Sequence, residues 1–335
     1  MKKHFTITLL LFSICFYAQE QTTAEETATE EKKFTFYGSV DTYYRANLTA
    51  PNDDNQIAPS TSFADKSGFA LGMANIIAKY EKNKVGAVAD LAFGPRAIQA
   101  SFIDSTFVNQ LYVFYNLSDK VKLTAGKFNT YLGYELISPV GNFNYSTSYL
   151  FTNGPFNHTG LKADFTLSEK TSLLLGVFNQ TDINLFNPDG SYAVGAQFGY
   201  NSQFLNILYD DAGLGLEIDF TGGFNPSESF FLGINGAYAD NDGEGFYGAA
   251  LYPQYTLNKS FILGLRGEYF TRQSDLIDDD PNVIAITLTG SYTVDDLTIK
   301  PEFRLDNGSK EIFITNELEP TKSLGSFLIA AIYKF

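Results

Sequence analysis

The sequence predicts an all-β protein, a transmembrane antiparallel up-and-down β-barrel. Three observations lead to this prediction. The composition is rich in Phe, Tyr and Gly, apolar and polar side chains alternate in segments of about ten residues, and very short turns alternate with longer connections. Aromatic and β-branched residues favour strands, and tight turns favour glycine. The segments number about sixteen, as in many outer-membrane barrels, with fourteen as the alternative because the stretch from Tyr200 to Gly213 is ambiguous.

The first eighteen residues have the layout of a secretory signal peptide. Two lysines precede an apolar run from Phe5 to Tyr17, and polar residues follow Ala18. Cleavage after Ala18 removes Cys15, the only cysteine, so we expect no disulfide and no thiolate metal site in the mature chain. Lipid attachment at Cys15 is the alternative, although the preceding Ile14 is bulkier than the small residue usual there.

The sequence therefore divides into three parts. Residues 1–18 are the predicted signal peptide, residues 19–33 a disordered acidic leader in the periplasm, and residues 34–335 the barrel. The leader consists mainly of Thr, Glu and Ala without apolar periodicity, so it cannot bury a core.

Charge and hydropathy exclude two classes of protein. The formal net charge of the chain is -15, which argues against nucleic acid as a partner. Beyond the signal peptide, no apolar stretch reaches the ~18 residues that a membrane-spanning helix needs. The remaining choice is between a soluble all-β protein and a membrane barrel.

Alternation gives each predicted strand one apolar face and one polar face. From Leu161 to Leu167 the odd positions are apolar, whereas Lys162 and Asp164 lie on the other face. The segment from Leu297 to Leu305 has a similar pattern. In a barrel the apolar face contacts lipid. The residues expected to face lipid include Phe165, Leu216, Ile218, Leu263, Ile299 and Phe327.

The lengths of the connections favour a membrane barrel over a soluble sandwich. Outer-membrane barrels place short turns on the periplasmic side and longer loops outside. The predicted short turns are 81–84, 118–120, 168–170, 258–259 and 295–296. The predicted longer connections include 46–68, 95–106, 132–157, 273–281 and 306–322.

The last segment ends the chain on an aromatic residue. Phe327, Tyr333 and Phe335 lie on one apolar face of a predicted final strand. This ending is similar to the signal that outer-membrane assembly machinery reads, so Tyr333 and Phe335 are candidates for an assembly signal. The alternative is an ordinary last strand that closes the barrel onto residues 34–45.

Three stretches resemble a known family: FYGSVDTYY at 36–44, AGKFNTYLGYE at 125–135 and GPFNHTG at 154–160. Together they resemble the OmpL-like family of β-barrel porins, most clearly from Phe34 to about Asn179. The resemblance implies a porin-like protein of the Gram-negative outer membrane. It implies neither a particular solute nor catalytic residues.

The polar face of so wide a barrel should enclose water, and its charges nearly cancel. Lys127 is out of phase with the other charges, and a bulge near Gly126 would return it to the lumen. We expect many of these charges to pair across strands. The candidates for the lumen wall are Asp41, Arg45, Asp90, Lys122, Lys127, Lys162, Asp164, Glu217, Asp219, Arg266, Glu268, Arg272, Lys300, Glu302 and Arg304.

The leading hypothesis is a channel for passive diffusion of small hydrophilic solutes, with weak selectivity for charge. Acidic loops should add a slight preference for cations. The sequence leaves open whether residues 132–157 fold into the lumen as a constriction or lie on the outer surface. A second hypothesis is a non-conducting surface barrel whose loops bind an external partner. The other expected partners are outer-membrane lipid, lipopolysaccharide and the assembly machinery, and the oligomeric state has no signature in the sequence.

No cofactor, metal or catalytic site is expected. The acidic segment from Asp240 to Glu244 fails the EF-hand test, because the twelfth position is Leu251 instead of a bidentate Glu, and it is interpreted as a hairpin loop. His158 is the only histidine beyond the signal peptide, and a structural role is favoured. A barrel hydrolase that uses His158 is the third hypothesis, and it requires a hydroxyl group and a carboxylate beside the imidazole.

Overall fold

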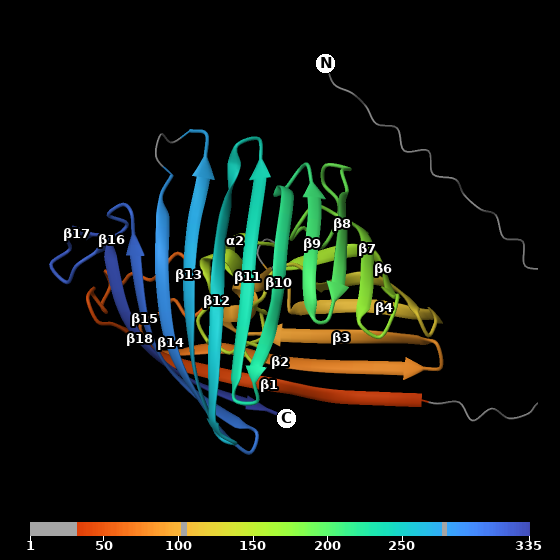
Figure 1. Ribbon diagram of the computed structural model, residues 1–335, viewed down its shortest axis with the longest axis horizontal. Coiled ribbons are helices and arrows are strands. Elements are labelled where there is room, and N and C mark those ends of the chain that lie inside the picture. Colours follow the sequence, from red (N-terminus) through yellow and green to blue (C-terminus); the bar gives the residue numbers. More distant parts are fainter. Residues whose placement is uncertain (1–31, 102–105, 277–279) are drawn as a thin grey trace, which may run out of the picture. The chain divides into compact units, whose positions relative to one another are not determined.

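The computed structural model describes residues 32–101, 106–276 and 280–335. The predicted signal peptide and residues 19–31 of the predicted leader lie outside the described residues. The described residues form a closed antiparallel barrel in which each strand pairs with its neighbours in the sequence (Figure 1). The last strand pairs with the first and closes the ring.

The barrel has sixteen strands among the described residues, as the sequence predicts. The fourteen-strand alternative is wrong, because the ambiguous stretch contains the whole of β9 and the tight turn at Asn201 and Ser202 that precedes it. The strands are β1 (Lys32–Asn47), β2 (Gly68–Lys82), β3 (Val85–Phe93), β4 (Val108–Ser118), β5 (Val121–Asn129), β6 (Asn157–Thr166), β7 (Thr171–Phe178), β8 (Ala193–Tyr200), β9 (Gln203–Asp210), β10 (Gly215–Ser227), β11 (Phe230–Asn241), β12 (Glu244–Asn258), β13 (Phe261–Ser274), β14 (Asn282–Val294), β15 (Leu297–Gly308) and β18 (Ser323–Lys334).

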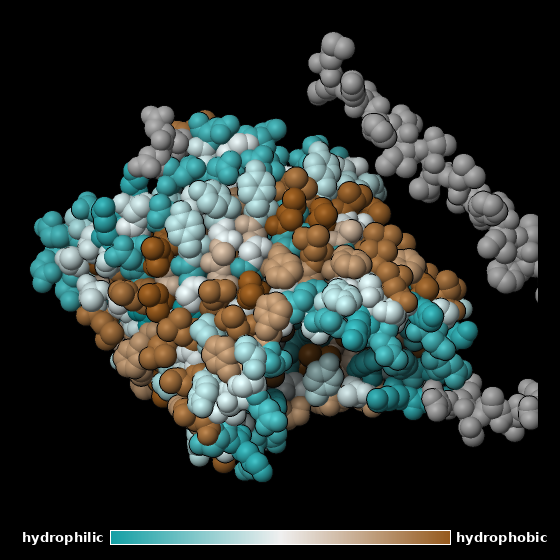
Figure 2. Space-filling view, in the orientation of Figure 1, coloured by the Kyte–Doolittle hydropathy of each residue, from teal (hydrophilic) through white to brown (hydrophobic). Residues whose placement is uncertain are grey.

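The two faces of the strands differ as the period of two requires. In β10 the charged Glu217 and Asp219 are buried, whereas Leu216 and Ile218 between and beside them are exposed. Apolar residues cover much of the strand wall, and polar residues gather at the turns and loops (Figure 2). An exposed apolar band of this kind suits contact with lipid. No helix among the described residues is long and apolar enough to cross a bilayer.

The connections at one end of the barrel are all tight turns. They join β2 to β3, β4 to β5, β6 to β7, β8 to β9, β10 to β11, β12 to β13 and β14 to β15. We call this the short-turn end, and β1 begins and β18 ends there. The opposite end carries the longer connections. One connection at that end is nevertheless a two-residue turn, where Asp242 and Gly243 both have positive φ, so the hairpin expected at this acidic segment is confirmed.

Three connections at the long-loop end contain further structure. Helix α1 (Pro95–Ser101) lies in the connection between β3 and β4, which the sequence predicts only as a loop. Helix α2 (Tyr149–Asn153) lies between β5 and β6. The small sheet of β16 (Phe313–Ile314) and β17 (Pro320–Thr321) lies between β15 and β18.

Residues 130–156, which we call the inner loop, fold into the barrel. Tyr145, Thr147 and Ser148 are completely buried, and Tyr145 hydrogen-bonds to strands on the wall. The question that the sequence leaves open is thus answered in favour of the inward position. Phe151 and Phe156 of the inner loop pack against Phe63 of the first long connection, and Ala97 and Ala100 of α1 belong to the same buried cluster.

Candidate functional site

A buried ion pair ties the inner loop to the wall. Arg266 on β13 donates to Glu135 of the loop, with 2.7 Å between Nη1 and Oε1, and both side chains are buried. The same guanidinium donates to the carbonyl oxygens of Ser146 at 2.6 Å and Thr147 at 3.1 Å. Its donors therefore hold the loop at two points that are separated by eleven residues.

Two wall carboxylates accept hydrogen bonds from the loop backbone. Glu302 on β15 accepts from the N–H groups of Tyr145 at 2.6 Å and Ser146 at 2.9 Å. Glu268 on β13 accepts from those of Tyr149 at 3.0 Å and Leu150 at 2.8 Å. The latter two N–H groups belong to the first turn of α2, where no intrahelical acceptor exists. These carboxylates thus satisfy backbone donors that the barrel interior would otherwise leave buried without partners.

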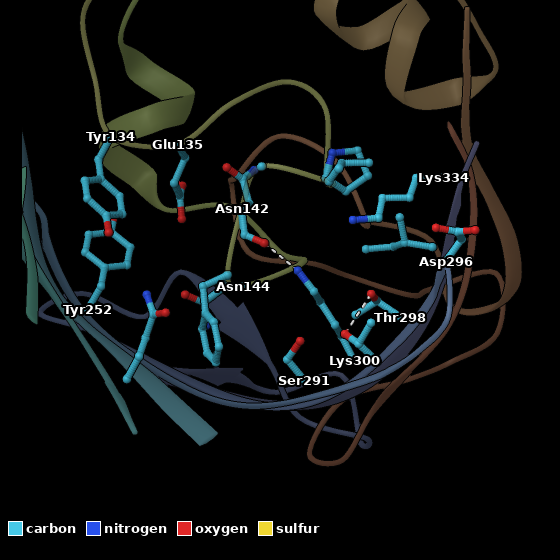
Figure 3. A pocket seen from close by; sticks show the side chains of 17 residues that line it. Tyr134, Glu135, Asn142, Asn144, Tyr252, Ser291, Asp296, Thr298, Lys300 and Lys334 are labelled. Carbon is cyan, nitrogen blue, oxygen red and sulfur yellow. Dashed lines mark hydrogen bonds between the residues drawn. The ribbon is translucent and has the colours of Figure 1, made fainter. Parts of the chain in front are cut away.

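Three further wall charges hold the same loop. Arg304 on β15 pairs with Asp306 on its own strand at 2.8 Å and donates to the carbonyl oxygen of Thr147 at 2.8 Å. Asp41 on β1 accepts a 2.5 Å hydrogen bond from the hydroxyl group of Tyr145. Lys300 on β15 donates to the carbonyl oxygen of Asn142 (Figure 3).

Two other carboxylates accept hydrogen bonds mainly from amide side chains of the wall, and one of them also binds the inner loop. Asp219 accepts from the side chains of Asn206 and Asn235, each at 2.6 Å, and from the N–H group of Gly133 at 3.0 Å. Asp90 accepts from three amide side chains on β2 and β4, those of Asn75, Asn109 and Gln110.

The structure buries most of the candidate lumen charges. Those that are buried are Asp41, Arg45, Asp90, Lys127, Glu217, Asp219, Arg266, Glu268, Lys300, Glu302 and Arg304. Lys122, Lys162 and Asp164 are only partly buried, and Arg272 is exposed near the end of β13. The Arg272 position falls in phase with the inward face, but it lies two residues before the end of the strand, at the long-loop end.

Two details of the charge prediction differ from the structure. The register of β5 with both neighbours continues unbroken through Gly126, so the bulge is absent. Lys127 is buried all the same, and its Nζ donates to the carbonyl oxygen of Val108 at 2.8 Å. The ion pairs of Lys162 with Asp164 and of Arg304 with Asp306 join residues two apart on one strand instead of residues across strands. Much of the wall's charge is directed to the inner loop, which sequence periodicity does not place.

A cavity of about 370 Å³ lies between the inner loop and the wall, towards the short-turn end. Tyr134 of the loop stacks on Tyr252 of β12, with 4.2 Å between the ring centroids, and Asp296 and Lys334 lie on the opposite side (Figure 3). Asn142 and other hydrogen-bonding side chains line the space between them. Burial, with a contribution from Glu135, raises the pKa of Tyr134 to about 12, so its hydroxyl group stays neutral at physiological pH.

The tyrosines and asparagines that line this cavity are absent from the sequence-based candidates. Tyr252 falls in phase with the inward face of its strand, so alternation could have found it. Tyr134 and Asn142 lie on the inner loop, and no periodic pattern places them.

His158 has one of the two neighbours that a hydrolase needs. Its Nε2 lies 2.9 Å from Oγ1 of Thr130, and its ring stacks on Phe178. Nδ1 has no hydrogen-bond partner among the described residues, so no carboxylate orients the imidazole there. The side chain is also completely enclosed by protein. This environment is that of a packed structural histidine.

Comparison with solved structures places the fold among outer-membrane barrels. An anion-selective porin from Comamonas acidovorans is 12% identical, with a TM-score of 0.63 over 91% of this chain and 100% of that chain. OmpT of Vibrio cholerae, an outer membrane protein, is 14% identical, with a TM-score of 0.58 over 93% of this chain and 100% of that chain. At these identities the likeness shows the fold alone. A search of curated proteins finds no match.

The fold and its neighbours define the class of the protein, a closed antiparallel β-barrel of the kind found in outer-membrane proteins. The sequence itself gives the family. A family model described as "Putative beta-barrel porin-2, OmpL-like" matches residues 33–335, nearly the whole chain, so the chain belongs to this family. The resemblance that the sequence shows up to about Asn179 thus extends through the C-terminal strands.

Proposed function

We propose that the protein is a channel through which small hydrophilic solutes diffuse passively across the outer membrane, with weak selectivity for charge. Membership of a porin-type family supports this function. The observation that carries it is the inner loop, which enters the barrel and leaves a polar cavity of about 370 Å³ beside it. A loop held in this way narrows the lumen and limits the size of the solutes that pass.

The position of the cavity, towards the short-turn end of the barrel, is compatible with such a channel. By the usual orientation of these barrels, the short-turn end faces the periplasm. The surface of the molecule is hollowed near this end, and polar residues border the hollow (Figure 2). Water and solutes therefore have access from the periplasmic side to the inner loop.

Conductance in a planar bilayer tests the proposal. Protein purified from outer membranes is expected to give steady ohmic current steps. A channel that runs past the inner loop is expected to lose current when a cysteine at Thr293, which lines the cavity, reacts with a bulky thiol reagent. The matched control is a cysteine at Leu263, which is exposed on the outer face of β13.

A non-conducting surface barrel is the second candidate, and one observation favours it. The buried cluster around Phe63, Phe151 and Phe156 joins two long connections and α1 inside the barrel, which narrows any path from the long-loop end. The same bilayer experiment separates the two functions. Absence of current in repeated insertions supports the sealed barrel and its external partner, and it contradicts diffusion.

A further inference from the structure

Three lysines converge on the inward face of β2, β5 and β6. The Nζ atoms of Lys79 and Lys122 lie 5.5 and 4.5 Å from the centroid of the same ring, that of Phe114 on β4. The Nζ atom of Lys162 lies 5.2 Å from the ring centroid of Phe128 on β5. Aromatic faces stabilise cations that approach in this way, so the rings hold the ammonium groups near one another despite their like charge. We call Lys79, Lys122 and Lys162 the lysine cluster.

The carboxylates around the lysine cluster do not neutralise it. Lys79 pairs with Glu81 at 3.0 Å, and Lys162 pairs with Asp164 at 3.2 Å. Lys122 lies opposite Asp164 in the register but forms no ion pair among the described residues. Two carboxylates therefore face three ammonium groups, and one positive charge remains.

The lysine cluster is accessible, whereas the acidic wall is not. The side chains of Lys79 and Lys162 are 41% and 21% exposed to solvent. By contrast Asp41, Glu268 and Glu302 are buried, and each accepts hydrogen bonds from the inner loop or the wall. The inner loop covers basic side chains such as Arg266 and Arg304 as well as carboxylates, so the wall charges that stay partly exposed include the lysine cluster with Glu81 and Asp164, and these do not cancel.

The lysine cluster lies just beyond the edge of a second cavity along the wall. This cavity, of about 340 Å³, shares Val140, Asp296 and Lys334 with the first and extends to Ile77 on β2. Lys79 is the next residue on the same face of this strand. The charges that line the first cavity, Lys300 and Lys334 with Glu135 and Asp296, cancel, so the excess positive charge at this end comes from the lysine cluster.

We propose that the lysine cluster is an anion-binding step on the permeation path, and that the channel prefers small solutes with a carboxylate or phosphate group. The preference for permeating solutes with a carboxylate or phosphate group rests on the proposed function as a channel. Binding of anions by the lysine cluster does not. Acidic loops at the opposite end give a cation preference at the mouth, but salt screens their field over about 10 Å at 0.1 M, so the interior charges set the selectivity.

Reversal potentials under a KCl gradient test the preference. The unmodified channel is expected to favour chloride. Lys122→Gln is expected to lower the permeability ratio of chloride to potassium by about threefold, and Lys122→Glu further, because each unit charge acts on ions a few ångströms away in water. The control is Lys170→Gln, which removes an exposed lysine from the β6–β7 turn at the same end. Gradients of potassium acetate and potassium phosphate then distinguish the two solute classes.

Fluorescence quenching tests anion binding at the lysine cluster even if the barrel conducts no current. The chain contains no tryptophan, so Asn116→Trp, at the position opposite Lys122 in the register, introduces a single tryptophan beside the cluster, whose emission can be excited apart from that of the tyrosines. Iodide is expected to quench it more than caesium does, and Lys122→Glu should remove the difference. Equal quenching, or a cation preference unaffected by Lys122→Glu, overturns the anion site. Iodide preference without any current supports the site and contradicts only the diffusion function.

Discussion

Arg266 and Glu135 form a buried ion pair of 2.7 Å although 131 residues separate them in the sequence. The pair joins the middle of β13 to the inner loop. Arg266 also donates to the carbonyl oxygens of Ser146 and Thr147, so one side chain holds two parts of the loop that are eleven residues apart in the sequence.

Removal of one partner of this pair should be costly. Arg266→Met leaves Glu135 buried without its counter-ion, and we expect the free energy of unfolding to fall by about 3–5 kcal/mol. The double variant Arg266→Met with Glu135→Gln should lose less, because neither charge is then left unpaired. Urea titrations of the folded barrel, followed by the shift of its band in electrophoresis, measure the difference. Equal losses in the single and double variants would show that the ion pair itself contributes nothing.

His158 should affect stability and not transport. Thr130→Val removes the hydrogen bond to Nε2 and should lower the free energy of unfolding by about 1 kcal/mol. Conductance should stay unchanged in Thr130→Val and in His158→Gln, since the imidazole is enclosed and does not reach the cavity. Parallel unfolding and bilayer measurements check this. Any ester hydrolysis that is lost in both variants would revive the hydrolase hypothesis.

Phe335 should promote assembly through its ring. The backbone of Phe335 exchanges two hydrogen bonds with Gly38 of β1, at 2.9 and 3.0 Å, and its ring lies 6.5 Å from that of Phe36. We predict that Phe335→Ala, which keeps the backbone pair, lowers the amount of folded protein in outer-membrane fractions, whereas passage across the inner membrane continues. Phe335→Tyr is the aromatic control. Full folding of the alanine variant would reduce the residue to an ordinary strand end.

A charged side chain on the outer face of the wall should destabilise the barrel, and the loss should be larger the deeper the position lies in the bilayer. Leu263 is exposed on the outer face of β13, so Leu263→Arg should destabilise the barrel by about 2–4 kcal/mol if the position lies near the centre of the bilayer. Leu276→Arg is the matched control, because Leu276 is 89% exposed in the connection that follows the same strand. Refolding titrations into lipid vesicles measure both. Similar effects at the two sites would argue against a lipid-facing wall.

The wall of the barrel could be predicted from the sequence because alternation is a local property. The opposite faces of Leu216 and Glu217 follow from the period of two, and most of the strand count follows from short turns such as that at 118–120. The ambiguity at 200–213 arose because the connection after β9 spans only residues 211–214, on the side where longer loops are the rule. Where the connections at both ends of a strand are short, the alternation of short turns with longer loops no longer marks where the strand begins and ends.

The interior could be predicted only in part. The sequence placed Glu302 on the inward face, but its partners are the N–H groups of Tyr145 and Ser146, which lie more than a hundred residues away. Neither a loop without periodicity nor a contact at such separation leaves a local pattern. For the same reason the balanced charges of the wall gave no sign that burial would remove most of them, acidic and basic alike, from the solvent.

The attachment of the inner loop has a consequence for the order of events during assembly. The loop lies between β5 and β6 in the sequence, yet many of its partners lie on β13 and β15, up to 158 residues later in the chain. Until those strands are present, the N–H groups of Tyr145, Ser146, Tyr149 and Leu150 have no acceptors in the wall, and contacts between such distant segments form slowly. The inner loop can therefore reach its final position only once β13 and β15 have taken their places in the wall, so the constriction is among the last parts of the barrel to form.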